Sequence, residues 1–65
     1  MELLNKKELA AYVGASEATV SDWIYRDVEL GPLSIKLGRR RVWDKARVDR
    51  YLADRFAEAE QKRAS

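Results

Sequence analysis

The chain has 65 residues, enough for one small domain, and a formal net charge of +2. It contains no cysteine and no histidine, which excludes disulfide staples, zinc sites built from these residues and catalytic triads with a histidine base. No apolar run is long enough to span a membrane and no signal-peptide core opens the chain, so we expect a soluble, cytoplasmic protein.

The first predicted helix covers Lys6–Val13. Asn5 is a good N-cap, and Glu8 stands three residues on, where a capping box needs it. Gly14 can adopt the left-handed conformation that commonly ends a helix. Strong local patterns therefore define both ends of this helix.

The second predicted helix covers Glu17–Arg26 and is capped by Ser16. Only one residue separates this cap from Gly14, and such a short glycine turn between two helices is typical of a helix-turn-helix. The positions expected to face the core are Val20, Trp23, Ile24 and, less strongly, Val28. The opposite face is centred on the small or polar residues Ala18, Ser21, Asp22 and Tyr25.

A short hairpin is predicted after the second helix. A glycine and a proline at positions 31 and 32 break the helical pattern. Residues 33–37 then alternate apolar with polar, as a half-buried strand does, and residues 40–43 can return as its partner after a turn at Gly38 and Arg39. The result is a two-stranded wing with three arginines at its tip.

The third predicted helix begins after Asp44, which serves as its N-cap. Its expected buried stripe consists of Val48, Tyr51, Leu52, Phe56 and Ala59. We therefore predict a mainly α fold with a small β-hairpin, a winged helix-turn-helix formed by residues 1–56. Residues 57–65 have little to bury and are expected to form a helical or frayed tail.

The charge is concentrated in one part of the chain. Residues 36–50 contain seven Lys or Arg and two Asp, a net +5, which is typical of a polyanion binder, although a solvated basic surface has the same composition. In a helix-turn-helix the second helix lies in the major groove of DNA, so we predict a duplex-DNA-binding module. The residues expected to face DNA are Ser16, Glu17, Ala18, Thr19, Ser21, Asp22, Tyr25 and Arg26 on the second helix, and Lys36, Arg39, Arg40 and Arg41 on the wing.

These residues differ in the contact that they can make. Ser16 and Thr19 can hydrogen-bond phosphates at the positive end of the helix. Glu17 and Asp22 repel phosphate, so each must accept a hydrogen bond from a cytosine amino group or orient a neighbouring arginine. The wing arginines can enter a minor groove or bind the flanking phosphates. A helical hairpin that binds only protein is the rival interpretation.

The sequence contains few residues that favour base stacking, nucleotide binding or catalysis. The spacing of Trp23, Trp43 and Tyr51 favours core positions over a base-stacking platform. The three glycines are isolated, so no loop can cradle a nucleotide phosphate, and the acidic residues of the third helix form ordinary surface pairs with Lys and Arg. We predict no enzymatic activity and no cofactor.

Most of the chain resembles the N-terminal DNA-binding domain of the terminase small subunits of lambda-like phages. The residues that carry this resemblance are Asn5, Lys6, Lys7, Glu8, Leu9, Ala10, Gly14, Ala15, Ser16, Thr19, Val20 and Trp23, and then Trp43, Asp44, Ala46, Val48, Tyr51, Ala53, Arg55, Ala57, Glu58 and Glu60. The resemblance implies a winged helix-turn-helix homodimer that marks viral DNA for packaging in the host bacterial cytoplasm. It also implies Glu17–Arg26 as the recognition helix and a large-subunit partner contacted by residues beyond Ser65.

The wing differs from the terminase pattern. Residues 35–42 (Ile-Lys-Leu-Gly-Arg-Arg-Arg-Val) are closer to the excisionase and AlpA-type regulators, which share the winged architecture and are short chains. This second resemblance implies a regulator of transcription or recombination. From the sequence alone, the terminase interpretation ranks first and the regulator is the alternative.

Overall fold

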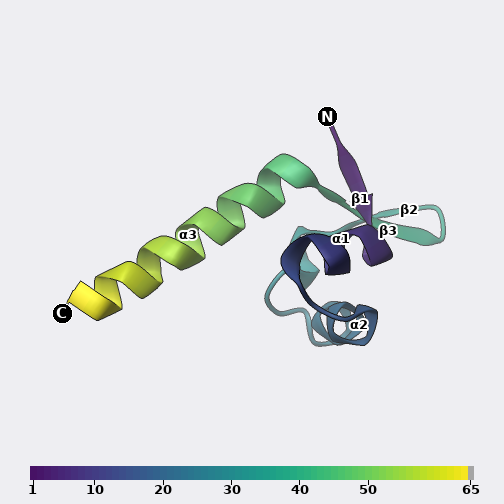
Figure 1. Cartoon of the computed structure of the whole chain (residues 1–65). Coiled ribbons are helices and arrows are strands. Elements are labelled where there is room, and N and C mark those ends of the chain that lie inside the picture. Colours follow the sequence, from purple (N-terminus) through teal and green to yellow (C-terminus); the bar gives the residue numbers. More distant parts are fainter. Residues whose placement is uncertain (65) are drawn as a thin grey trace.

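A computed structural model describes residues 1–64 of the chain; Ser65, the last residue of the predicted tail, lies outside the described part. The elements are, in chain order, β1 (Leu3–Asn5), α1 (Lys6–Val13), α2 (Glu17–Arg26), the 3-10 helix η1 (Gly31–Leu33), β2 (Ile35–Leu37), β3 (Arg40–Asp44) and α3 (Lys45–Ala64). Both helices of the predicted helix-turn-helix have the expected bounds. The predicted fold class, a mainly helical winged helix-turn-helix, is confirmed (Figure 1).

The sheet has three strands rather than the predicted two. Its order is β1-β3-β2, with both pairs antiparallel, and Leu4 of β1 lies opposite Trp43 of β3. The sequence prediction missed β1, because a strand of three residues shows no alternation and forms only where β3 offers it a partner. The wing is therefore an extension of a sheet that also holds the N-terminal segment.

The predicted strand at residues 33–37 was wrong in two respects. Leu33 belongs to η1, so β2 begins only at Ile35. Ile35 and Leu37 are each 51% exposed, so this face of β2 is less buried than predicted, although Val42, the β3 partner of Ile35, is buried. The alternation correctly predicts a strand but cannot say whether anything packs against it.

Local capping explains where the first two helices begin and end. The Asn5 side chain accepts a hydrogen bond from the backbone N–H of Glu8 (2.7 Å), and the Glu8 carboxylate accepts one from the backbone N–H of Asn5 (2.9 Å), which completes the capping box. Gly14 has φ +76° and ends α1, as predicted. Asp27, in the same left-handed region at φ +57°, ends α2.

The connection from α2 to the wing is held by a close backbone approach at Gly31. A Cβ at this position would lie 2.3 Å from the carbonyl oxygen of Trp23, so only glycine fits. The preceding residue, Leu30, is 2% exposed, and its carbonyl accepts a hydrogen bond from the indole Nε1 of Trp43 at 2.8 Å. One buried tryptophan thereby joins the connection between α2 and η1 to strand β3.

The core lies where α1, α2, β3 and the start of α3 meet. Its buried residues are Leu4, Leu9, Ala10, Val20, Leu30, Trp43 and Val48. Trp43 is fully buried, and Trp23 and Tyr51 pack against the cluster, so the prediction that the three aromatic residues belong to the core is confirmed.

Helix α3 begins in this core and then leaves it. Asp44 accepts a hydrogen bond from the backbone N–H of Ala46 (3.2 Å), as an N-cap does, and Val48 is fully buried. Further along, Phe56 is 69% exposed and Ala59 is exposed, so the second half of the predicted stripe is not buried. The reason is geometric: α3 extends beyond the body, which gives the molecule extents of 45 × 25 × 18 Å (Figure 1). In the described part of the chain, no helix is long and apolar enough to cross a membrane.

Candidate nucleic-acid interface

The outer face of α2 carries most of the residues predicted to face DNA. The exposed ones are Ser16, Glu17, Ala18, Thr19, Asp22, Tyr25 and Arg26, with Tyr25 at 90%. Ser21 differs from the expectation, because its side chain is half-buried and its hydroxyl oxygen accepts a hydrogen bond from Lys6 Nζ at 3.0 Å. Ser21 therefore lies at the contact between α2 and α1 rather than on the outermost surface.

The hydroxyl groups at the start of α2 are already engaged with each other. Ser16 Oγ accepts a hydrogen bond from the backbone N–H of Thr19 (3.1 Å) and lies 2.9 Å from Thr19 Oγ1. One of the two hydroxyl hydrogens makes this mutual bond, so the other is left to donate. The helix start can thus offer one hydroxyl donor to an anion without losing its cap.

Asp22 is paired with an arginine one helical turn away. Its Oδ1 lies 3.6 Å from Arg26 Nε, and both side chains are more than half exposed. An exposed pair at this spacing contributes only about 0.3–0.5 kcal/mol, so it directs the guanidinium without fixing it. Of the two roles considered for Asp22, the orientation of a neighbouring arginine has a geometric counterpart in the structure.

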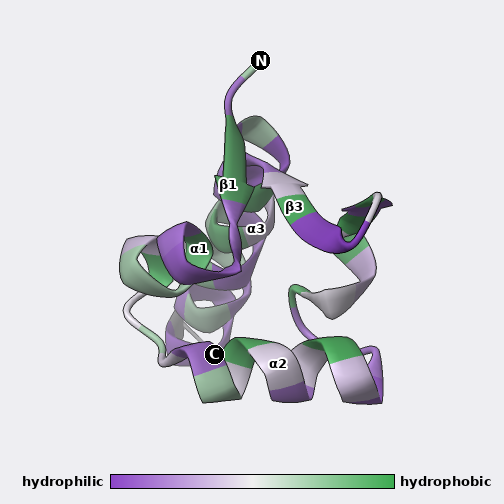
Figure 2. Ribbon diagram, turned by 90° about the vertical axis from the view of Figure 1, so that its right-hand side faces the viewer, coloured by the Kyte–Doolittle hydropathy of each residue, from purple (hydrophilic) through white to green (hydrophobic). Residues whose placement is uncertain are grey.

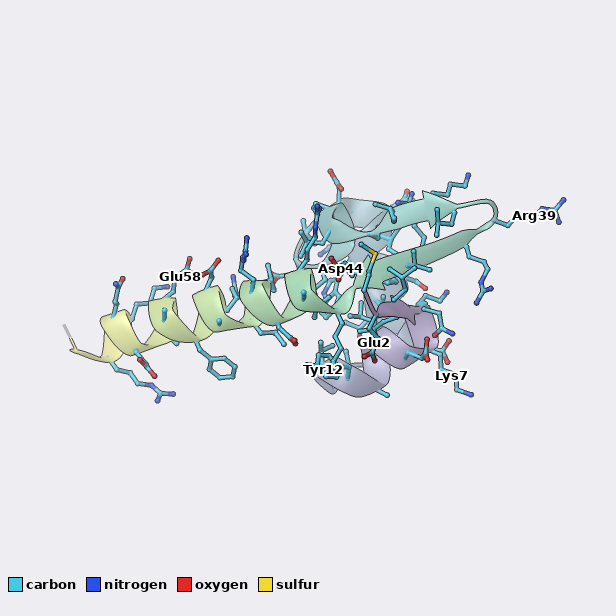
Figure 3. All side chains as sticks on the ribbon, turned by 90° about the horizontal axis from the view of Figure 1, so that it is seen from above. Glu2, Lys7, Tyr12, Arg39, Asp44 and Glu58 are labelled. Carbon is cyan, nitrogen blue, oxygen red and sulfur yellow. The ribbon has the colours of Figure 1, made fainter. Side chains whose placement is uncertain are left out.

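The wing presents its basic residues on different faces. In the β2–β3 register Lys36 lies opposite Arg41, and Leu37 lies opposite Arg40, so these two pairs point to opposite sides of the hairpin. Arg41 donates a hydrogen bond from Nη1 to Ser34 Oγ (3.1 Å), while Arg39 extends from the turn away from the body (Figure 3). Figure 2 shows the start of β3 as a strongly hydrophilic segment on the outward-facing hairpin.

An open groove of about 380 Å³ connects these elements. The residues that line it are Asn5, Lys6 and Lys7 at the start of α1, Glu17 and Ile24 on α2, and Arg39, Arg40 and Arg41 on the wing. Five cationic side chains therefore line the groove together with one carboxylate. The start of α1, one flank of α2 and the tip of the wing thus form a single, strongly basic surface.

A family model of the helix-turn-helix domain matches residues 3–55, which include β1, α1, α2, the wing and the first half of α3. The chain belongs to the helix-turn-helix domain family. Comparison with curated proteins and comparison with solved structures found no match. Because the helix-turn-helix is a DNA-binding motif, family membership supports DNA binding by this chain.

The charges of this helix-turn-helix domain are arranged to favour a polyanion on one side. Among the described residues, the side chains of Lys7, Arg39 and Arg40 form no hydrogen bond or ion pair. Four cations outside the groove are paired instead with carboxylates: Arg26 with Asp22, Lys45 with Glu2, Arg47 with Asp44 and Arg55 with Glu29. Within residues 1–64, no ion pair neutralises any of the five cations that line the groove, so this side of the domain favours a polyanion.

The sequence prediction missed two residues of this surface, Lys6 and Lys7. They lie at the start of a helix whose pattern indicated only a structural element, and some 30 residues separate them from the wing. Their charge was visible in the sequence, but their position beside Arg39, Arg40 and Arg41 results from the β1–β3 pairing, which brings the start of α1 to the wing.

Proposed function

We propose that this chain is a sequence-specific regulator that binds duplex DNA, of the excisionase and AlpA type, with α2 in the major groove and the wing on the adjacent backbone or minor groove. The observation that carries the proposal is the basic wing beside α2, in which the side chains of Arg39 and Arg40 have no described partner, in a chain that belongs to the helix-turn-helix domain family. The regulator is favoured over the packaging role because the family match includes the wing, where the chain resembles these regulators.

The α2 surface supports a division of labour among its residues. Ala18 leaves room for close approach, while Ser16 and Thr19 offer a hydroxyl donor to a phosphate. The Asp22–Arg26 pair provides a directed guanidinium, which suits a guanine edge, and Asp22 itself suits a cytosine amino group. Specificity is therefore assigned to α2 and general affinity to the wing.

Selection of duplexes from a randomised library tests this proposal. We expect the wild-type protein to enrich a short common sequence and to bind it with an affinity that falls steeply as salt rises. If the protein retained all duplexes of the library equally, its binding would be non-specific and the proposed sequence specificity would be wrong. Absence of binding to any duplex at low salt would refute the proposal altogether.

The terminase small subunit remains the second candidate. Two observations favour it: the residue-level resemblance at both ends of the chain, and the projection of α3 away from the DNA-facing side, where it can carry a contact to another protein (Figure 1). The genes next to this one distinguish the candidates. An integrase gene supports the regulator, whereas a large-terminase gene supports packaging.

We also propose that the protein acts as a homodimer. A second, mainly apolar groove of about 320 Å³ lies between α3 and the body and is lined by residues that include Trp23, Tyr51, Leu52 and the exposed Phe56. Sedimentation should show a dimer of the wild type that Phe56→Ser weakens. A monomer at high micromolar concentration, both free and on DNA, would contradict this proposal.

A further inference from the structure

The basic groove lies between α2 and the wing, so it belongs to neither of these two predicted DNA-binding elements alone. It runs along the flank of α2 that carries Glu17 and Ile24, and its other side is the wing tip. Its third side is the start of α1, with Lys6 and Lys7. Figure 3 shows Lys7 and Arg39 at the same end of the molecule, opposite the end of α3.

The geometry of B-DNA indicates what lies in such a groove. The major groove is about 12 Å wide and the minor groove about 6 Å wide, and one sugar–phosphate strand separates each from the next. If α2 enters a major groove while the wing reaches the neighbouring minor groove or its edge, the protein must straddle that strand. The space between α2 and the wing is then the space that the strand occupies.

We propose that this groove holds the phosphate backbone of one DNA strand, and that Lys6 and Lys7 of α1 bind its phosphates from the side opposite the wing arginines. The inference rests on the proposed function, since it requires α2 to be bound to duplex DNA. It adds α1 to the interface as a backbone-binding element.

The two lysines are suited to this role in different ways. Lys6 donates one hydrogen bond to Ser21, which holds its ammonium group beside α2 and leaves two of its three N–H donors for phosphate oxygens. Lys7 is exposed and, within residues 1–64, has no partner of its own. Glu17 is the only carboxylate lining the groove, so five cations are opposed by one anion.

The test compares two variants that remove the same charge from different places. Lys7→Gln removes a cation from the groove, whereas the control Arg63→Gln removes one from the last turn of α3, at the far end of the molecule (Figure 1). Fluorescence anisotropy with a labelled duplex, either selected or of random sequence, gives the dependence of affinity on salt. Lys7 has no described hydrogen bond to lose, so its replacement should leave the fold intact.

We expect Lys7→Gln to reduce the slope of log affinity against log salt by about 0.9, the value of one phosphate contact, while Arg63→Gln leaves the slope unchanged. A fourfold rise in salt should then weaken the wild type about 3.5-fold more than Lys7→Gln. The preferred sequence should be the same for all three proteins, because a phosphate contact does not distinguish bases.

Single methylphosphonate substitutions in the duplex locate the contact. At one backbone position, the neutral group should weaken the wild type and have no effect on Lys7→Gln. If the wild type binds duplex DNA but Lys7→Gln and Arg63→Gln have the wild-type slope, the strand does not lie in this groove. If the wild type binds no duplex at low salt, the proposed function itself fails, and the two failures are thereby distinguished.

Discussion

Gly31→Ala should destabilise the protein more than any other glycine-to-alanine change in it, although Gly31 has no unusual backbone conformation. The added Cβ would lie 2.3 Å from the carbonyl oxygen of Trp23 and 2.8 Å from its carbonyl carbon. That carbonyl cannot easily turn aside, because it accepts a hydrogen bond from the backbone N–H of Val28 at 3.0 Å. To relieve the clash, η1 and the end of α2 must separate by roughly 1 Å.

The expected cost follows from this geometry. Overpacking typically costs about 1–3 kcal/mol, and we expect the upper end because the opposing atoms are backbone. A domain of this size has a free energy of unfolding of about 3–10 kcal/mol, so the loss is a large fraction of it. At about 4–8 °C per kcal/mol, the melting temperature should fall by roughly 12–24 °C.

Gly14→Ala is the matched control. Gly14 has φ +76°, where a side chain is strained, but a Cβ added there would have no atom within 4 Å. Its cost should be about 1–2 kcal/mol, the penalty of the left-handed conformation alone. Urea unfolding followed by circular dichroism measures both variants. If Gly31→Ala is destabilised no more than Gly14→Ala, the close approach of η1 to α2 is not a constraint on this fold.

Three further predictions concern the interface and its support. Asp22→Ala should change the preferred DNA sequence, with a loss of about 1–3 kcal/mol of discrimination at one base pair, and should leave or raise general affinity; an unchanged preference in library selection contradicts this. Arg40→Ala should weaken binding to all sequences and lower the salt slope by about one unit; a rewritten preference would instead assign specificity to the wing. Burial, and then the hydrogen bond that Tyr51 donates to Glu29, raise the pKa of Tyr51 above its usual 10.0. The contribution of the protonated Tyr51 to the free energy of unfolding is therefore fully present below pH 10 and is lost as the pH rises through the raised pKa of the folded protein. Urea unfolding at pH values above 10 should show that the free energy of unfolding falls less in Tyr51→Phe than in the wild type. An identical fall in both proteins would contradict a contribution from Tyr51 ionisation.

The helix-turn-helix could be predicted from the sequence because its determinants are local. Asn5 with Glu8, the turn at Gly14 and the cap at Ser16 each act within a few residues of the backbone that they fix, and the structure has both helices at the predicted bounds. The alternation before Gly38 likewise predicts a strand. Such patterns depend on neighbouring residues along the chain and require no knowledge of the tertiary arrangement.

The features that could not be predicted depend on long-range packing. Strand β1 exists because Leu4 pairs with Trp43, which is 39 positions later in the chain. A segment of three residues contains no pattern from which this pairing could be predicted. Phe56 continues the helical spacing of Val48 and Leu52, but α3 has left the body of the protein by the time it reaches Phe56. Apolar residues at the same spacing are therefore buried in the first half of α3 and exposed in the second. The basic groove has the same origin, since the fold alone brings Lys6 and Lys7 to the wing.

Mapping of backbone amide shifts by NMR during titration with a selected duplex locates the DNA-binding surface. We expect the perturbed amides to cluster on residues 16–26 of α2 and residues 36–41 of the wing, with a smaller set at the start of α1, while the amides of residues 57–63 of α3 stay unchanged. Perturbations centred on α3, or spread evenly over the chain, would contradict the assignment of α2 and the wing as the DNA-binding surface.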